Sequence, residues 1–307
     1  MLKQRVITAV IMLAVLYAGT AWLSLPWFAG FLTLILLPAL YEWGKLMGLR
    51  QWQHHATWFA LFGSCLLLTL TALRLPVMGL DDVQIGGATV TDYEPLSVNG
   101  IVVIAGLAVL YWLWVFWTIR SYPGGSRRWQ ARWKIGLMGI ACLIPSWVGL
   151  VYLKMLNGAG WLVLILVAMV SVVDIGAFFA GSIWGKKEGR RPLAPALSPK
   201  KTWAGLWGGL VSCTLFTWSV LAWVHLQYRE LSASVWALLM MISLLLAVYS
   251  VVGDLFESML KRHRGIKDSG RTLPGHGGIL DRIDSLLAAT PVFVLGIALL
   301  SRVLEVI

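Results

Sequence analysis

The chain has 307 residues, of which 59% are hydrophobic and 13% are charged. A soluble globular protein has about 45–50% apolar and about 25% charged residues, so this composition excludes a soluble domain, a disordered chain and a disulfide scaffold. Only a bilayer solvates so much apolar surface, and the 18 Trp residues favour a chain that meets membrane–water interfaces. The sequence therefore predicts an all-α, polytopic integral membrane protein.

The net charge of +11 has two interpretations, which are nucleic-acid binding and the positive-inside bias of a membrane protein. In so apolar a chain we favour the second, with the lipid bilayer as the partner and no nucleic acid. The cysteines lie in apolar runs without CxxC spacing, which predicts small buried hydrophobes rather than metal ligands. The sequence does not determine the oligomeric state, and a homodimer stays an open alternative.

A transmembrane helix needs about 20 mainly apolar residues. Nine stretches qualify: 6–24, 27–47, 56–75, 100–119, 135–153, 161–183, 204–224, 235–253 and 286–304. The first is interpreted as a retained span, because no small-residue cleavage site precedes a polar segment. The second is the least certain span, because Pro26 and Pro38 favour a bent or shallow helix there. We divide the chain into an N-terminal transmembrane region, 1–134, and a C-terminal catalytic region, 135–307.

Basic residues predict the orientation of these spans. The N-terminal segment and every second loop after it together hold 21 Lys and Arg residues, against four in the remaining segments. Lys and Arg are retained on the cytoplasmic side, which predicts a cytoplasmic N-terminus and an outer C-terminus. The segment 76–99, on the predicted outer side, carries acidic residues and no Lys or Arg.

The cytoplasmic segment 258–284 reads SMLKRHRGIKDSGRTLPGHGGILDRID. Its glycines let backbone N–H groups approach an anion closely, beside a dense run of cations. Asp281 and Asp284 share a face if they are helical, and Arg282 between them points elsewhere, where it would meet a phosphate. Asp254 and Glu257 repeat this spacing upstream. The alternative is a solvated positive-inside loop, but that rule does not require acidic residues. Carboxylates are the usual Mg²⁺ ligands when phosphates complete the shell.

Two further features lie upstream of this segment. Asp174 lies within an apolar span, where an ionisable group marks a functional site unless it forms a structural ion pair. In Ser198-Pro199-Lys200-Lys201-Thr202, the hydroxyls suit a cap for the next helix. The two Lys residues suit an anion held at that helix N-terminus.

The segment 258–284 resembles the signature of the membrane phosphatidate cytidylyltransferases (CDP-diacylglycerol synthases), S-x-x-K-R-x(4)-K-D-x-[GSA]-x-x-[LIF]-[PG]-x-H-G-G-x-x-D-R-x-D. Every fixed position matches: Ser258, Lys261, Arg262, Lys267, Asp268, Gly270, Leu273, Pro274, His276, Gly277, Gly278, Asp281, Arg282 and Asp284. DIGAFF at 174–179 is similar to the family's D-x-G-A-Y-F, and SPKKT at 198–202 to its S-P-x-K-T. Phe178, Ser182 and Ala204 depart from the residues usual in the family.

The resemblance implies that CTP and phosphatidic acid form CDP-diacylglycerol and pyrophosphate, with Mg²⁺ held by Asp254 and Asp281. Glu257 and Asp284 are second choices, and a second cation is an alternative because two-metal clamps suit in-line displacement. The implied catalytic residues are Asp281, Asp254, Lys267 and Arg282. The implied substrate-binding residues are Asp174, Ser198, Lys200, Lys201, Thr202, Ser258, Lys261, Arg262, Asp268, His276, Gly277, Gly278 and Asp284. We interpret His276 as a phosphate or turn residue, with a general base as the alternative.

Two other classes compete with this interpretation. A CTP-dependent polyprenol or phytol kinase would release CDP rather than pyrophosphate. A transporter would place charges near the midplane of both halves of a repeated fold, and in the first 160 residues the nearest such residue, Glu42, lies close to a span end. The compact chain favours a bacterial-type inner membrane with the active site on the cytoplasmic side.

Overall fold

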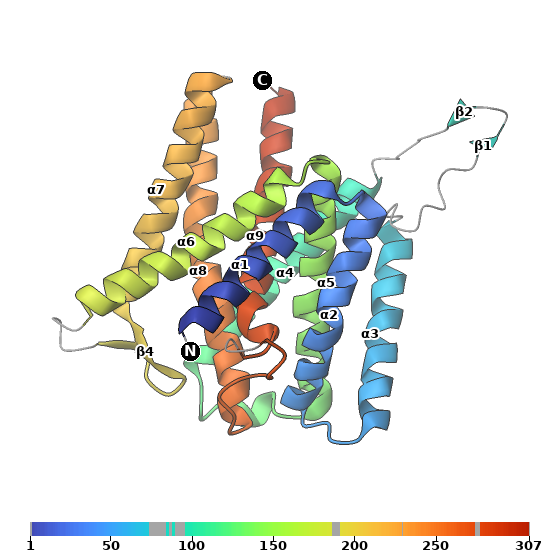
Figure 1. Ribbon diagram of the computed structural model, residues 1–307, viewed down its shortest axis with the longest axis vertical. Helices are drawn as coiled ribbons and strands as arrows, with labels where there is room; N and C mark the ends of the chain where they lie inside the picture. The colour runs from blue at the N-terminus through green and yellow to red at the C-terminus, as the bar shows by residue number, and fades with distance from the viewer. Residues whose placement is uncertain are drawn as a thin grey trace.

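The computed structural model describes residues 2–73, 84–85, 88–89, 96–185, 191–228, 230–273 and 277–306. The described chain is almost entirely helical, as Figure 1 shows. Its helices are α1 (Leu2–Trp22), α2 (Leu25–Met47), α3 (Trp52–Leu73), α4 (Leu96–Arg120), α5 (Arg132–Leu156), α6 (Trp161–Ile183), α7 (Trp203–Gln227), α8 (Ala233–His263) and α9 (Leu280–Val306). A short 3₁₀ helix covers Ser126–Arg128. Two small antiparallel hairpins pair β1 (Gln84–Ile85) with β2 (Ala88–Thr89) and β3 (Pro192–Ala194) with β4 (Ser198–Thr202).

Eight of the helices in the described residues, α2 to α9, are long and apolar enough to cross a membrane, and α1 contains a shorter apolar stretch, Val10–Trp22. This confirms the predicted all-α membrane fold, with nine as an approximate number of spans. Helix α2 is continuous through Pro38. Most of the segment 76–99 lies outside the described residues.

One end of the bundle carries the turns that the charge pattern assigns to a single side. We call it the basic end, and it is formed by residues 48–51, 121–131, 191–202 and 264–273. Arg264 at the end of α8 donates to the carbonyls of Leu46 and Met47 at the end of α2. Trp129, in the α4–α5 turn, makes an edge contact with His263, also at the end of α8. The C-terminus lies at the opposite end in Figure 1.

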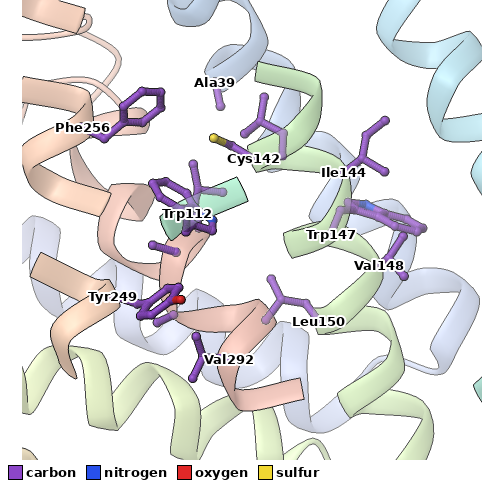
Figure 2. Close-up of a cluster of buried hydrophobic side chains, with 14 of the residues drawn as sticks. Ala39, Trp112, Cys142, Ile144, Trp147, Val148, Leu150, Tyr249, Phe256 and Val292 are labelled. Carbon is purple, nitrogen blue, oxygen red and sulfur yellow. The ribbon is translucent and has the colours of Figure 1, made fainter. Parts of the chain in front are cut away.

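The core joins helices from both halves of the sequence. Trp112 on α4 is 1% exposed and packs edge-on against Phe256 on α8, with ring centroids 5.5 Å apart. Figure 2 shows these two rings in the same buried cluster as Cys142 on α5. Burial of such rings supplies a large share of the packing energy in a core. One contiguous cluster therefore fixes α8 against the N-terminal helices, and the division at residue 134 stays a prediction.

Helices α6 and α7 approach each other closely through glycines. A Cβ atom at Gly176 would lie 2.8 Å from the carbonyl oxygen of Gly208, and one at Gly208 would lie 2.7 Å from that of Gly176. Small residues of this kind allow membrane helices to pack backbone to backbone. Because α6 and α7 form one wall of the cavity described next, this crossing positions that wall.

Candidate active site

An open cavity of about 700 Å³ lies at the basic end, between α6, α7, α8 and the first turn of α9. We call it the acidic cavity, because carboxylates from three helices surround it. Its wall includes ten of the predicted site residues: Asp174, Lys200, Lys201, Thr202, Asp254, Lys261, Asp268, Asp281, Arg282 and Asp284. The structure therefore brings together all three sequence features that resemble the family, although they are separated along the chain.

Asp281 is the most extensively hydrogen-bonded of these carboxylates. It lies in the first turn of α9, where a negative charge interacts favourably with the positive end of the helix dipole. Its Oδ1 atom accepts from Lys261 Nζ at 2.5 Å. Its Oδ2 atom accepts from the backbone N–H groups of Gly278 at 2.8 Å and Ser269 at 3.0 Å. The Asp281 side chain is only 8% exposed. The loop before α9 covers it and donates backbone hydrogen bonds to it.

Lys261 joins two carboxylates on neighbouring helices. Its Nζ atom lies 2.9 Å from Glu257 Oε2, one turn earlier on α8, and 2.5 Å from Asp281 Oδ1 on α9. Both carboxylates are buried, and such a pairing is stable only when each charge is compensated. Glu257 Oε1 is buried without a hydrogen-bond partner among the described residues. Removing the Lys261 ammonium group would therefore leave two carboxylates facing each other in a poorly hydrated site.

Asp254 is more exposed than Asp281 and also lines the acidic cavity. Its side chain is 30% exposed, forms an ion pair with Lys201 and accepts a long hydrogen bond of 3.5 Å from Ser258. The charge of Asp254 also acts on Asp174 and on Asp284. Asp254 thus repels two neighbouring carboxylates, and the ammonium group of Lys201 partly offsets both interactions.

Lys200 and Lys201 reach the cavity on β4, directly before α7. Thr202 caps that helix, because its hydroxyl oxygen accepts from the Gly205 N–H at 3.1 Å. The predicted capping role is confirmed for Thr202. Two cations therefore lie beside a helix N-terminus, whose N–H groups and dipole already favour an anion. Ser198 begins β4 opposite Ala194, and it is not among the residues that line the cavity.

Two glycines before α9, Gly277 and Gly278, lie against the carboxylate of Asp281. Gly277 has a φ of +85°, a conformation that favours glycine, and a Cβ atom there would lie 2.8 Å from Asp281 Oδ2. Gly278 provides one of the N–H donors to the same oxygen. Both glycines therefore act through Asp281 in this structure. His276 lies outside the described residues.

Two predicted cations, Arg262 and Lys267, are not among the described residues that line the acidic cavity. Arg262 Nε donates to the Leu197 carbonyl at 3.2 Å and so ties α8 to the β3–β4 turn. Lys267 lines a separate cavity, which also includes Lys45 and Arg50. Arg262 therefore holds the β3–β4 turn against α8. The substrate roles assigned to Arg262 and Lys267 stay predictions.

Glu42 on α2, which the sequence places close to a span end, is not among the predicted site residues, yet it contacts the loop before α9. Its carboxylate is fully buried, and it accepts from the hydroxyls of Ser269 at 3.0 Å and Thr272 at 2.6 Å. It also accepts from the backbone N–H groups of Ile279 at 3.1 Å and Leu280 at 2.9 Å. Glu42 therefore caps the start of α9 from another helix. The available signal was an acidic residue inside a predicted span.

The described side chains do not form a complete metal cage, because no group of three or more His, Cys, Asp or Glu residues among them is arranged to hold an ion. Mg²⁺ is commonly bound by one or two carboxylates, with substrate phosphates and water in the remaining positions. The cavity offers carboxylates of that kind on α8 and α9, and Lys201 and Lys261 now contact two of them.

The site is a cavity lined by carboxylates and lysines at one end of a bundle of membrane-spanning helices, which defines a polytopic membrane protein with a charged pocket. The profile described as "Cytidylyltransferase family" matches residues 3–300. The chain is 36% identical over 294 residues to a phosphatidate cytidylyltransferase of Pseudomonas aeruginosa, covering 95% of this chain and 96% of that protein. It is 30% identical to a phosphatidate cytidylyltransferase of Haemophilus influenzae, covering 95% of this chain and 97% of that protein.

A shorter match supports the same family. A phosphatidate cytidylyltransferase of Staphylococcus haemolyticus is 42% identical over 123 residues, which are 40% of this chain and 44% of that protein. The chain belongs to the cytidylyltransferase family, and the predicted membership is confirmed.

Proposed function

We propose that the protein is a phosphatidate cytidylyltransferase, which converts CTP and phosphatidic acid to CDP-diacylglycerol and pyrophosphate. The observation that carries this proposal is the mixed character of the acidic cavity. Its charged wall suits phosphates, while Phe178 on α6, Leu206 on α7 and Val251 on α8 give it an apolar wall. A soluble triphosphate and a lipid phosphate both fit such a site. The relatives from P. aeruginosa and H. influenzae, both phosphatidate cytidylyltransferases by name, support the same reaction.

The chemistry is a displacement at phosphorus. A phosphate oxygen of phosphatidic acid attacks the α-phosphorus of CTP, and the bond from that phosphorus to the bridging oxygen of the β-phosphate breaks. Pyrophosphate leaves with the bonding electrons. The nucleophile is already an anion, so no general base is required. The protein contributes positioning and neutralisation of charge, which dominate catalysis of phosphoryl transfer.

Four cations on the cavity wall suit the neutralising role: Lys200, Lys201, Lys261 and Arg282. Lys201 is 26% exposed and its ion-pair partner Asp254 is also partly exposed, so a phosphate in the cavity could compete with Asp254 for the ammonium group. Lys261 is 11% exposed and is held between Glu257 and Asp281. We therefore assign Lys201 to substrate binding. We assign Lys261 to fixing the carboxylates, with its remaining hydrogen available for a phosphate oxygen.

The carboxylates fit a divalent ion such as Mg²⁺, with Asp254 and Asp281 as the protein ligands. When bound, Mg²⁺ would neutralise charge on the triphosphate and stabilise the leaving pyrophosphate. The repulsion of Asp254 with Asp174 and with Asp284 supports a cation at this place. Glu257 and Asp284 are the second choices, as ligands of a second cation or as groups that orient the first two.

We assign the basic end to the cytoplasmic face of a bacterial inner membrane. The 21 Lys and Arg residues on the segments predicted to share this side support the orientation. A cytoplasmic opening gives CTP access from water while phosphatidic acid stays in the leaflet. The bacterial sources of the relatives support this location.

The test uses purified full-length protein in mixed micelles with phosphatidic acid, CTP and Mg²⁺. We expect one pyrophosphate for each cytidine-bearing lipid formed, and no release without phosphatidic acid. EDTA should abolish the reaction and excess Mg²⁺ should restore it. Release of CDP with phosphorylation of a lipid alcohol would overturn the proposal in favour of a kinase.

A further inference from the structure

A second cavity at the basic end has a different composition from the acidic cavity. It has a volume of about 860 Å³, and we call it the cationic cavity. Six basic residues from three parts of the chain line it: Lys45, Arg50, Arg132, Arg264, Lys267 and Arg271. Asp268 is the only acidic residue among its described lining. None of these six cations takes part in the ion pairs found among the described residues.

The structure holds some of these like charges close together. Arg264 is fixed by its bonds to the carbonyls of Leu46 and Met47 at the end of α2. Burial, followed by the nearby positive charge of Arg132, lowers the pKa of Arg264. The positive-inside rule explains why cations are on this side, but it does not require them to converge on one cavity. Their convergence indicates an anionic ligand.

An apolar groove adjoins this cavity. It has a volume of about 540 Å³ and is lined by Tyr41 and by α3 residues that include Trp52 and Phe59. Arg50 lines both the groove and the cationic cavity. A second link is Lys45 of the cavity, whose Nζ atom lies 4.4 Å from the centre of the Tyr41 ring. The two spaces together offer a cationic site for a head group and an apolar site for a chain.

Exposed tryptophans place this region at the depth of lipid head groups. Trp52 is 77% exposed at the groove, and Trp133, which follows Arg132, is 64% exposed. Trp side chains favour the membrane–water interface, where the ring meets both apolar and polar surroundings. Anionic lipids of the inner leaflet attract basic residues at this depth.

We propose that the cationic cavity and its apolar groove bind the head group and part of one acyl chain of an anionic glycerophospholipid, at a site separate from the acidic cavity. Asp268 lines both cavities, so the 266–271 loop forms a shared wall between the two sites. Occupation of the second site would steady this wall. The proposal stands independently of the reaction proposed above, because its ligand need not be a substrate.

The test measures binding of phosphatidylglycerol to the full-length protein. Native mass spectrometry in a neutral detergent would count the bound lipid across a titration. The test variant is R50Q/R132Q, which removes two cavity cations from exposed positions. The control is R127Q/R128Q, which removes the same charge from exposed residues of the α4–α5 turn, close in sequence to Arg132, that line none of the described cavities.

We expect R50Q/R132Q to bind phosphatidylglycerol at least about tenfold more weakly than the native protein, since each basic residue near a lipid surface contributes on the order of 1 kcal/mol. R271Q, which approaches the cavity from the α8–α9 loop, should also weaken binding. R127Q/R128Q should stay within about twofold of the native affinity. Equal weakening in both double variants, or no weakening in R50Q/R132Q, would overturn the proposal.

A competition arm separates a lipid from a free phosphate. Glycerol 3-phosphate carries the same phosphate ester without an acyl chain, so we expect it to displace phosphatidylglycerol only at far higher concentration. A second variant, Ala56→Phe, fills the groove and should weaken phosphatidylglycerol while leaving glycerol 3-phosphate binding unchanged. Equal potency of the two ligands in the native protein would contradict the lipid assignment.

Discussion

Glu42 Oε2 on α2 and Asp281 Oδ2 on α9 both lie 3.0 Å from the same hydroxyl oxygen, that of Ser269. Glu42 and Ser269 are 227 positions apart in the chain. A hydroxyl has one proton, so it donates to only one of the two carboxylates at a time. The backbone N–H of Ser269 also donates to Asp281. The N-terminal half thus positions the loop that holds Asp281.

Replacing Glu42 should therefore lower stability and activity, although Glu42 is not among the residues that line the acidic cavity. In Glu42→Gln the side chain keeps its size but loses one acceptor oxygen, and at least one of the four donors is left unsatisfied in a buried place. We expect the free energy of unfolding to fall by about 1–3 kcal/mol and turnover to fall as the loop loosens. Thermal unfolding in detergent and pyrophosphate release would measure the two effects. Glu230→Gln, an exposed acid before α8, is the control. Native Tm and activity in Glu42→Gln would contradict a positioning role.

The two proposed metal ligands should differ in their effect on stability. Asp254→Asn and Asp281→Asn are both expected to lower turnover by about a hundredfold or more, as the loss of an electrostatic catalytic group commonly does. Asp254 is 30% exposed and its exposed ion pair adds little stability, so its variant should keep the native Tm. Asp281 anchors the loop, so its variant should unfold at lower temperature. Activity within a few-fold of native in either variant would remove that residue from the proposed metal site.

The two cavity lysines provide a matched pair. Lys201→Ala should raise the KM for CTP at least about tenfold, because a charged hydrogen bond to phosphate is lost, while the protein stays folded. Lys261→Ala leaves two buried carboxylates without their cation and should cost about 3–5 kcal/mol of stability. Steady-state kinetics and thermal unfolding of both variants would check this contrast. A stable Lys261→Ala protein would show that the Glu257–Lys261–Asp281 cluster is not needed for the fold.

Two glycines with positive φ test the support behind Asp281. Gly277→Ala places a Cβ atom 2.8 Å from Asp281 Oδ2, in addition to backbone strain. Gly265→Ala, with a φ of +68° and nothing within 4 Å of the new atom, adds only the strain of about 1–2 kcal/mol. We expect Gly277→Ala to lose most of its activity and Gly265→Ala to keep most of it. Similar activities would mean that the contact with Asp281 is unimportant.

Much of this architecture could be predicted from residue patterns. Apolar runs and the alternation of basic loops predicted the spans, because the bilayer imposes one length and one charge rule along the whole chain. The convergence of Asp174, the 198–202 segment and the 258–284 segment followed from their resemblance to one family. The predicted helical spacing of Asp281 and Asp284 is confirmed, since both lie on α9.

Other features depend on three-dimensional contacts that no local pattern carries. Hydropathy ended the eighth span at residue 253, but α8 continues to His263, and in this extension Lys261 pairs with both Glu257 and Asp281. Lys267 and Asp268 are adjacent in sequence, yet only Asp268 also lines the acidic cavity. Glu42 resembled a residue at a span end, and only its partners on the distant loop reveal its position.

The most direct measurement follows the phosphorus atoms of CTP. Parallel reactions with phosphatidic acid would contain CTP labelled at the α-phosphorus or at the γ-phosphorus, and the products would be separated into lipid and water phases. We expect the α-label in a cytidine-bearing lipid and the γ-label in aqueous pyrophosphate. Transfer of γ-label to lipid, or its release as orthophosphate with no labelled lipid, would contradict the proposed reaction.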